Sequence, residues 1–176
     1  RVEIGARTRV CVIGDGKLGQ LIVRVLATRG CDITMAGKHD DKLQKAVAAG
    51  AKVVRVEQDQ PVTNFPGKHY SFDVVVEASG SPSGADLALA LVRPRGAVVL
   101  KSTHHDRTLL DLSRVVVNEL TLVGSRCGRF RPAVELLEKG AISVRDMITG
   151  RFALDRWEEA FKTAAEPSSL KVVISM

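Results

Sequence analysis

The chain has 176 residues, of which 45% are hydrophobic and 26% are charged, a composition typical of a single globular domain. The spacings of its three cysteines match neither a zinc template nor a disulfide framework, so we expect a reducing, cytoplasmic setting. The net charge of +6 comes from scattered basic residues and aromatic residues make up only 4%, which argues against nucleic acid as a partner. No apolar run approaches the ~20 residues of a membrane-spanning helix, so a membrane is not an expected partner either.

Predicted strands and helices alternate along the chain, which favours a parallel sheet with crossover helices. Short apolar runs predict strands at 9–13, 32–36, 52–56, 72–76, 97–101, 120–123 and 171–174. Apolar residues at helical spacing predict helices that begin near Leu18, Asp40, Pro82, Pro132 and Asp155. We therefore expect an α/β fold, a doubly wound parallel sheet of the Rossmann type with about six strands and helices on both faces.

Three details of this pattern make further predictions. Asp40 or Asp41 is expected to cap the second helix, and Asp155 is spaced with Glu158 as a capping pair. Residues 57–71 contain two prolines and a glycine without periodicity, which predicts an irregular connection. The last two helices are expected to bury apolar faces, which consist of Ala133, Leu136 and Leu137 in one and Trp157, Ala160, Phe161 and Ala164 in the other.

The sharpest motif is the glycine loop Gly14-Asp15-Gly16-Lys17-Leu18-Gly19, between the first buried strand and the first helix. In this context the first glycine permits a tight turn, the second lets the backbone approach a pyrophosphate, and the third lets helix and strand pack closely. The positive end of the helix then faces the phosphates. We expect Gly14, Gly16, Lys17, Leu18 and Gly19 to bind a dinucleotide; the alternative is a strand–helix turn that needs glycine only for steric reasons.

The end of the second predicted strand bears on which dinucleotide is bound. An acidic residue there would accept a hydrogen bond from the ribose 2′-hydroxyl of NAD, but this sequence has Gly37-Lys38-His39. Gly37 leaves room for a 2′-phosphate, to which Lys38 and His39 can donate. We therefore predict NADP(H) in preference to NAD(H), although a loop shift that brings Asp40 to the ribose would favour NAD(H).

Ordered matches along nearly the whole chain resemble the cofactor-binding half of the medium-chain dehydrogenase/reductase superfamily, the zinc-type alcohol dehydrogenase-like proteins. The matching stretches are 10–19, 49–51, 72–80, 94–99, 119–125, 159–161 and 171–174. The resemblance implies an oxidoreductase that transfers hydride to or from an alcohol or carbonyl substrate. An NAD(H)-dependent member of the family and a non-catalytic dinucleotide-sensing module are the alternatives.

The resemblance also implies roles for individual residues. Ala78 and Ser79 are expected to pass along the cofactor, Ser102 to lie near the nicotinamide ribose, and Arg126 to contact the cofactor. The strand at 120–123 is implied to pair across a two-fold axis in a homodimer; the alternative is a strand covered within the monomer.

The family's catalytic domain and its zinc ligands precede the cofactor domain and have no counterpart in this sequence, which starts at Arg1 rather than at a Met. Zinc is therefore expected only on a domain absent from this chain, and no catalytic residue is assigned. By itself the chain is expected to bind cofactor and catalyse little. Residues 1–125 should form the dinucleotide-binding core, and residues 126–176 should complete the unit and lead back toward the catalytic domain.

Overall fold

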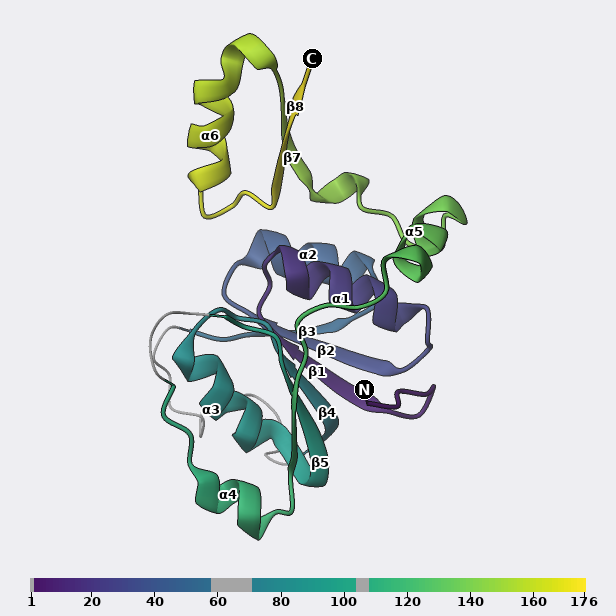
Figure 1. Ribbon diagram of the computed structural model, residues 1–176, viewed down its shortest axis with the longest axis vertical. Helices are drawn as coiled ribbons and strands as arrows, with labels where there is room; N and C mark the ends of the chain where they lie inside the picture. The colour runs from purple at the N-terminus through teal and green to yellow at the C-terminus, as the bar shows by residue number, and fades with distance from the viewer. Residues whose placement is uncertain (1, 58–70, 104–107) are drawn as a thin grey trace. The chain divides into compact units, whose positions relative to one another are not determined.

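The computed structural model describes residues 2–57, 71–103 and 108–176 (Figure 1). The chain divides into two compact units, Arg1–Phe130 and Arg131–Met176. Most of the connection predicted at 57–71 lies outside the described residues. Within the described ranges, no helix has the length and apolar character needed to cross a membrane.

A six-stranded parallel sheet with the order β3-β2-β1-β4-β5-β6 forms the first unit. Its strands are β1 (Arg9–Ile13), β2 (Asp32–Gly37), β3 (Lys52–Arg55), β4 (Phe72–Glu77), β5 (Val92–Leu100) and β6 (Thr121–Gly124). This is the order of a doubly wound Rossmann sheet, in which the direction of winding reverses between β1 and β4. The predicted fold class is confirmed.

Successive side chains of β1 enter two hydrophobic cores, one on each face of the sheet. Val10 and Val12 belong to one core, and Cys11 and Ile13 belong to the other. The helices of this unit are α1 (Lys17–Ala27), α2 (Asp40–Ala48), α3 (Pro82–Leu91) and α4 (Leu112–Val117). Figure 1 shows α1 and α2 on one face of the sheet and α3 on the other. Because both faces are covered, β1 reads in the sequence as a continuous apolar run.

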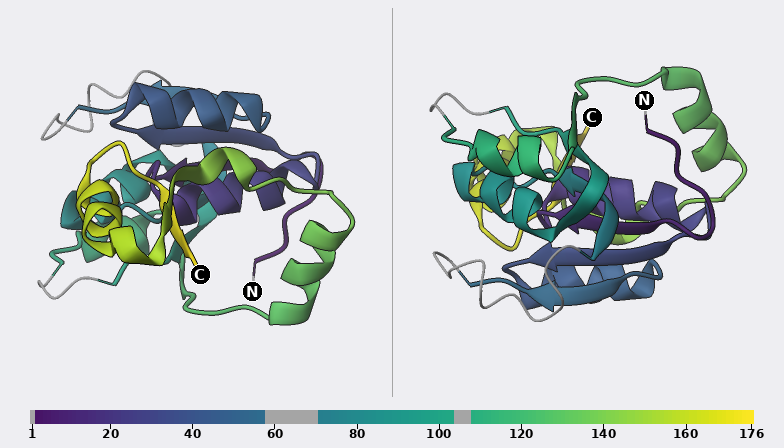
Figure 2. Two further views of the ribbon diagram at one scale, coloured as in Figure 1. Left: turned by 90° about the horizontal axis from the view of Figure 1, so that it is seen from above. Right: turned by 90° about the horizontal axis from the view of Figure 1, so that it is seen from below.

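Helix α4 was not predicted, because six residues are fewer than two turns and carry no readable periodicity. The view from below in Figure 2 shows it next to α3. Arg114 of α4 reaches Asp86 of α3, with 3.7 Å between Nη1 and Oδ1. Val116 and Val117 of α4 stay exposed.

Two element boundaries differ from the prediction. His39 is the N-cap residue of α2, and Asp40 and Asp41 lie in its first turn, where their charge suits the helix dipole. β5 begins at Val92 rather than at residue 97, because the chain pairs with β4 before the turn at 93–96 as well as after it. The register between β4 and β5 shifts across this turn.

The second unit contains a two-stranded parallel sheet and helix α6 (Trp157–Ala165), which packs on that sheet. Its strands are β7 (Ile148–Ala153) and β8 (Lys171–Ser175); α5 (Phe130–Glu138) starts at the unit boundary, and single-turn helices lie at Arg145–Met147 and Leu154–Arg156. The predicted capping pair is wrong, because Asp155 lies in the second of these turns and the N-cap residue of α6 is Arg156.

The predicted apolar faces of α5 and α6 are mostly exposed. Among the described residues of α5 none is buried, and in α6 only Ala160 is. Trp157 and Phe161 are 51% and 66% exposed, and they contact each other edge to face. In α6 the prediction fails because a sheet of two strands covers only part of one face of the helix.

Candidate functional site

Two loops meet where the winding of the sheet reverses, at the carboxyl ends of β1 and β4. The glycine loop follows β1, and the turn at 78–81 follows β4. The N–H of Ala78 donates to the carbonyl of Ile13, and the N–H of Gly14 donates to the carbonyl of Ala36, both at 2.8 Å. In open α/β sheets this edge is where ligands bind, so these loops define the candidate site.

The three glycines of the loop differ in what surrounds them. Gly14 has a φ of +111°, and a β-carbon on it would lie 2.5 Å from the carbonyl oxygen of Ala78. A β-carbon on Gly19 would lie 1.9 Å from the carbonyl oxygen of Gly14. A β-carbon on Gly16 would meet nothing within 4 Å. Protein packing therefore demands glycine at the first and third positions, whereas the second faces open space.

Helix α1 begins at this open position. Gly16 is its N-cap residue and provides no side-chain cap, and the first turn holds no acidic residue. The first N–H groups of a helix have no acceptor within it, so those of Lys17, Leu18 and Gly19 remain available beside the positive end of the dipole. Lys17 is exposed and adds a positive charge. This arrangement suits an anion such as a pyrophosphate.

At the end of β2 the structure corrects the sequence-based expectation. Gly37 does not leave an empty space: a β-carbon on it would lie 2.6 Å from the β-carbon of Asp15. Oδ2 of Asp15 accepts the backbone N–H groups of Lys38 and His39, each at 2.7 Å. Nδ1 of the His39 ring lies 3.0 Å from the same oxygen. Asp15 therefore fills the space over Gly37 and ties the glycine loop to the end of β2.

Two cationic side chains lie near this contact. Lys38 is exposed at the end of β2. Arg55, at the end of β3, is the register partner of Gly37, and its guanidinium pairs with Asp40. Asp40 lies in the first turn of α2, and this exposed ion pair directs its carboxylate toward β3.

A buried carboxylate shapes the turn after β4. Glu77 is 2% exposed, and its Oε1 accepts the Ser79 N–H at 2.8 Å and the Ser79 hydroxyl at 2.6 Å. A β-carbon on Gly84 would lie 2.2 Å from the Ser79 Oγ, so this contact also requires glycine in α3. The N–H of Gly80 donates to the Ser102 hydroxyl at 2.8 Å. Both predicted serines thus hold the loops of the site in place.

Arg126 follows β6 at the same edge of the sheet, and its side chain is exposed. The Lys101 ammonium donates to the Arg126 carbonyl at 2.9 Å, which connects the segments after β5 and β6. The structure therefore brings every predicted cofactor-binding residue to one edge of the sheet. These residues are Gly14, Gly16, Lys17, Leu18, Gly19, Gly37, Lys38, His39, Ala78, Ser79, Ser102 and Arg126.

The sequence did not single out Asp15 or Arg55 as residues of this site, and it gave Glu77 only as part of the segment expected to pass along the cofactor. Asp15 and Arg55 reach the end of β2 only through strand pairing and loop packing, which leave no local signal. Glu77 had a signal, since it is an acidic residue at the end of an apolar strand, a position that seldom buries a charge without hydrogen-bond partners.

The residues that the structure describes do not form a catalytic zinc site. No group of three or more His, Cys, Asp or Glu side chains in the described ranges could hold a metal ion.

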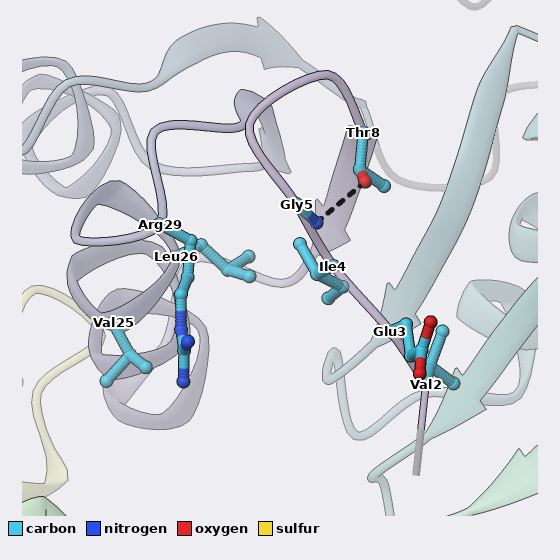
Figure 3. Close-up of a pocket in the computed structure, with 8 residues that line it drawn as sticks. All are labelled: Val2, Glu3, Ile4, Gly5, Thr8, Val25, Leu26 and Arg29. Atoms are coloured by element: carbon cyan, nitrogen blue, oxygen red, sulfur yellow. Dashed lines mark hydrogen bonds between the residues drawn. The ribbon is translucent and has the colours of Figure 1, made fainter.

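A separate hollow of about 810 Å³ lies at the opposite edge of the sheet (Figure 3). It is lined by the segment before β1 and by the last turns of α1, and the side chains of Ile4 and Leu26 both line it. The amino ends of the strands lie there, far along β1 from the glycine loop. This hollow is therefore not part of the candidate site.

Comparison with known proteins identifies relatives over nearly the full chain. D-arabitol-phosphate dehydrogenase of Enterococcus avium is 29% identical over 174 residues, which are 94% of this chain and 49% of that protein. The chain thus spans about half the length of the curated relatives it matches.

Solved structures share the fold. An alcohol dehydrogenase described as short-chain, from Escherichia coli CFT073 in complex with NADH, has a TM-score of 0.87 at 23% identity and covers 98% of this chain and 53% of its own. A putative zinc-binding dehydrogenase from Sinorhizobium meliloti 1021, bound to NADP, has a TM-score of 0.86 at 24% identity and covers 98% of this chain and 54% of its own.

The family model described as glucose dehydrogenase C-terminus matches residues 3–176. This match spans both units and confirms the resemblance to the zinc-type alcohol dehydrogenase-like proteins. The chain belongs to the glucose dehydrogenase C-terminus family, within the medium-chain dehydrogenase/reductase superfamily.

Proposed function

We propose that this chain binds NADP(H), and that it serves as the cofactor-binding domain of an oxidoreductase that transfers hydride to or from an alcohol or carbonyl substrate. The observation that carries the proposal is the contrast between Gly16 and its two neighbouring loop glycines. Gly14 and Gly19 are enclosed by protein atoms, whereas Gly16 is open at the start of α1. Open backbone at a helix N-terminus is the requirement of a pyrophosphate.

The bound dinucleotide would extend along the carboxyl edge of the sheet. Its pyrophosphate would lie on the N–H groups that begin α1, and its adenosine would reach the end of β2, where Gly37, Lys38 and His39 lie. Ala78 and Ser79 would pass along it, with Ser102 and Arg126 toward the nicotinamide end. The cofactor supplies the hydride, and this chain supplies binding and orientation.

Lys38 is the residue that favours the phosphorylated cofactor. Its exposed ammonium stands at the strand end where the ribose 2′ position is held in this fold. A 2′-phosphate gains from this charge, whereas a 2′-hydroxyl gains little. One related fold is known with NADP bound and another with NADH, so the family resemblance accommodates either cofactor.

Titration of the purified protein with NADPH and with NADH tests this proposal, with binding followed by calorimetry. We expect both to bind and NADPH to bind more tightly. Equal affinities, or tighter NADH, would overturn the NADP(H) assignment, and no binding of either would overturn the dinucleotide assignment.

In this proposal, the residues that act on the substrate belong to a catalytic domain outside this chain. The matched dehydrogenases are about twice as long, and residues 126–176 would lead from the cofactor domain toward their catalytic domain. Any zinc would belong to that domain. A dehydrogenase assay of the longest native protein with polyols and sugars tests the activity; dinucleotide binding without turnover would favour the sensing module.

We also propose a homodimer formed through β6. This strand is at the edge of the sheet, and beside it α4 exposes Leu112, Val116 and Val117 at 62%, 76% and 79%. An open strand edge next to exposed apolar side chains favours pairing with a second copy. Sedimentation should show a dimer, which the double change Val116→Glu and Val117→Glu should convert to a monomer that still binds cofactor. A wild-type monomer would contradict this.

A further inference from the structure

We propose that Asp15 is a specificity-determining residue that weakens binding of the 2′-phosphate and so limits the preference for NADP(H). This inference rests on the proposed function, because it requires the adenosine end of the cofactor to lie at the end of β2. Asp15 is the second residue of the glycine loop, a position for which the motif itself demands no particular side chain.

The Asp15 carboxylate occupies a site built for an anion. Two successive backbone N–H groups, those of Lys38 and His39, converge on its Oδ2 at 2.7 Å each, and Nδ1 of the His39 ring lies 3.0 Å away. His39 is also the N-cap residue of α2, so the positive end of that helix is adjacent. These are the donors that a phosphate at the end of β2 would use.

The carboxylate also stands where an acidic side chain of β2 would stand. A β-carbon on Gly37 would lie 2.7 Å from Oδ2 and 2.8 Å from Cγ of Asp15. In dinucleotide-binding folds an acidic residue at that place accepts the ribose 2′-hydroxyl and excludes a 2′-phosphate. Here the acid comes from the glycine loop instead of from the strand.

Asp15 and Lys38, both at the end of β2, have opposite effects on a 2′-phosphate. Asp15 is only 7% exposed, so solvent screens its charge poorly, whereas Lys38 is exposed and well screened. A 2′-phosphate would be attracted by Lys38 but repelled by Asp15, which also holds the two N–H groups. A neutral 2′-hydroxyl would not be repelled, and it would gain little from Asp15, because Oδ2 already accepts two backbone N–H groups. Asp15 should therefore lower the affinity for NADPH and leave that for NADH nearly unchanged.

The isosteric change Asp15→Asn tests this inference, because it removes the charge and keeps one oxygen to accept the N–H groups. Binding of adenosine 2′,5′-bisphosphate and of adenosine 5′-monophosphate, which differ only in the 2′-phosphate, is measured alongside NADPH and NADH. We expect the variant to bind both 2′-phosphorylated compounds roughly three- to tenfold more tightly. The two compounds without that phosphate should change by less than about twofold. Intact mass confirms that the new amide, which precedes Gly16, has not hydrolysed to a carboxylate.

The change Asp32→Asn is the matched control. It removes the same formal charge at the other end of β2, where Asp32 pairs with Lys52 at 2.8 Å. It should leave the ratio of the two affinities unchanged, which separates a local effect from the change in net charge. Asp15→Ser is the second variant, because the shorter side chain leaves most of the space over Gly37 empty. Urea unfolding shows whether each variant is folded.

The outcomes separate this inference from the proposed function. If the wild-type chain binds dinucleotides but the affinity ratio of folded Asp15→Asn and Asp15→Ser equals that of the wild type, Asp15 has no role in specificity. A shift of both variants toward NADH would also overturn the inference. If the wild type binds none of the four compounds, the proposed function fails and this inference fails with it.

Discussion

The carbonyl oxygen of Gly14 lies 1.9 Å from the point where a β-carbon on Gly19 would stand. Carbon and oxygen atoms in van der Waals contact are well over 3 Å apart, so the first turn of α1 fits against the end of β1 only because residue 19 has no side chain. The change Gly19→Ala must therefore displace the helix from the strand. We expect the free energy of unfolding in urea to fall by about 1–3 kcal/mol.

Gly5→Ala is the control for that experiment, because a β-carbon on Gly5 would meet no atom within 4 Å. It should change the stability by less than about 0.5 kcal/mol. If Gly19→Ala were as stable as Gly5→Ala, the close packing of helix and strand would not be needed.

The open surroundings of Gly16 predict the opposite behaviour, a loss of binding without a loss of stability. Gly16 has φ of −69° and ψ of −176°, which any residue can adopt, and a β-carbon there would meet no atom within 4 Å. In Gly16→Val the added side chain would occupy the space proposed for the pyrophosphate. We expect unchanged urea unfolding and a roughly tenfold or larger loss of affinity for NADPH and NADH alike. Normal affinity would place the pyrophosphate elsewhere.

Lys38 should act on one cofactor only. Removing its ammonium in Lys38→Ala takes a positive charge from the 2′ position, so we expect affinity for NADPH to fall about fivefold and affinity for NADH to stay nearly the same. Lys17→Ala is the comparison, because Lys17 begins α1 beside the proposed pyrophosphate. That change should weaken both cofactors equally. An equal effect of Lys38→Ala on the two cofactors would remove Lys38 from the 2′ site.

Asp73, at the amino end of the sheet, should make the stability of the first unit depend on pH in the acid range. Burial by itself would raise the pKa of Asp73, but hydrogen bonds from the Arg9 N–H and from the Arg93 and Arg9 guanidiniums outweigh burial and lower the pKa to about 2. The Arg93 Nε lies 2.6 Å from Oδ1, and the Arg9 N–H nitrogen lies 2.7 Å from Oδ2.

A carboxyl whose pKa is lower in the folded state stabilises the fold above its ordinary pKa, and the stabilisation is lost as the pH falls. For Asp73 the loss should occur between its ordinary pKa of 3.8 and about 2. Urea unfolding measured from neutral pH down to pH 2 should show Asp73→Asn less stable than the wild type at neutral pH, with the difference shrinking between pH 3.8 and pH 2. A constant difference would show that the ionised form contributes nothing.

Features of this chain that show in a local sequence pattern could be predicted, whereas contacts between distant segments could not. The apolar run of β1, the spacing of its three loop glycines and the order of strands and helices all follow from local patterns. These patterns predicted the six-stranded sheet and the carboxyl-end loops. The short helix α4 escaped prediction because six residues give periodicity nothing to repeat.

Burial in the second unit could not be predicted from helix periodicity. The apolar spacing in α6 correctly predicts a helix, but Trp157 and Phe161 remain exposed because two strands cover one stripe of it. An amphipathic pattern states which face can be buried, whereas the amount of sheet available decides how much of it is.

By itself the sequence determined the doubly wound fold, the position of the glycine loop and the edge of the sheet where a ligand would lie, because each of these follows from interactions between residues near in the chain. Only the tertiary structure decided what stands over Gly37. The sequence showed glycine there and predicted an empty space, but Asp15, which lies 22 residues before Gly37 in the chain, fills it through hydrogen bonds to Lys38 and His39. A contact between two loops cannot be predicted from the sequence of either loop alone, because the parallel pairing of β1 with β2 is what brings them together.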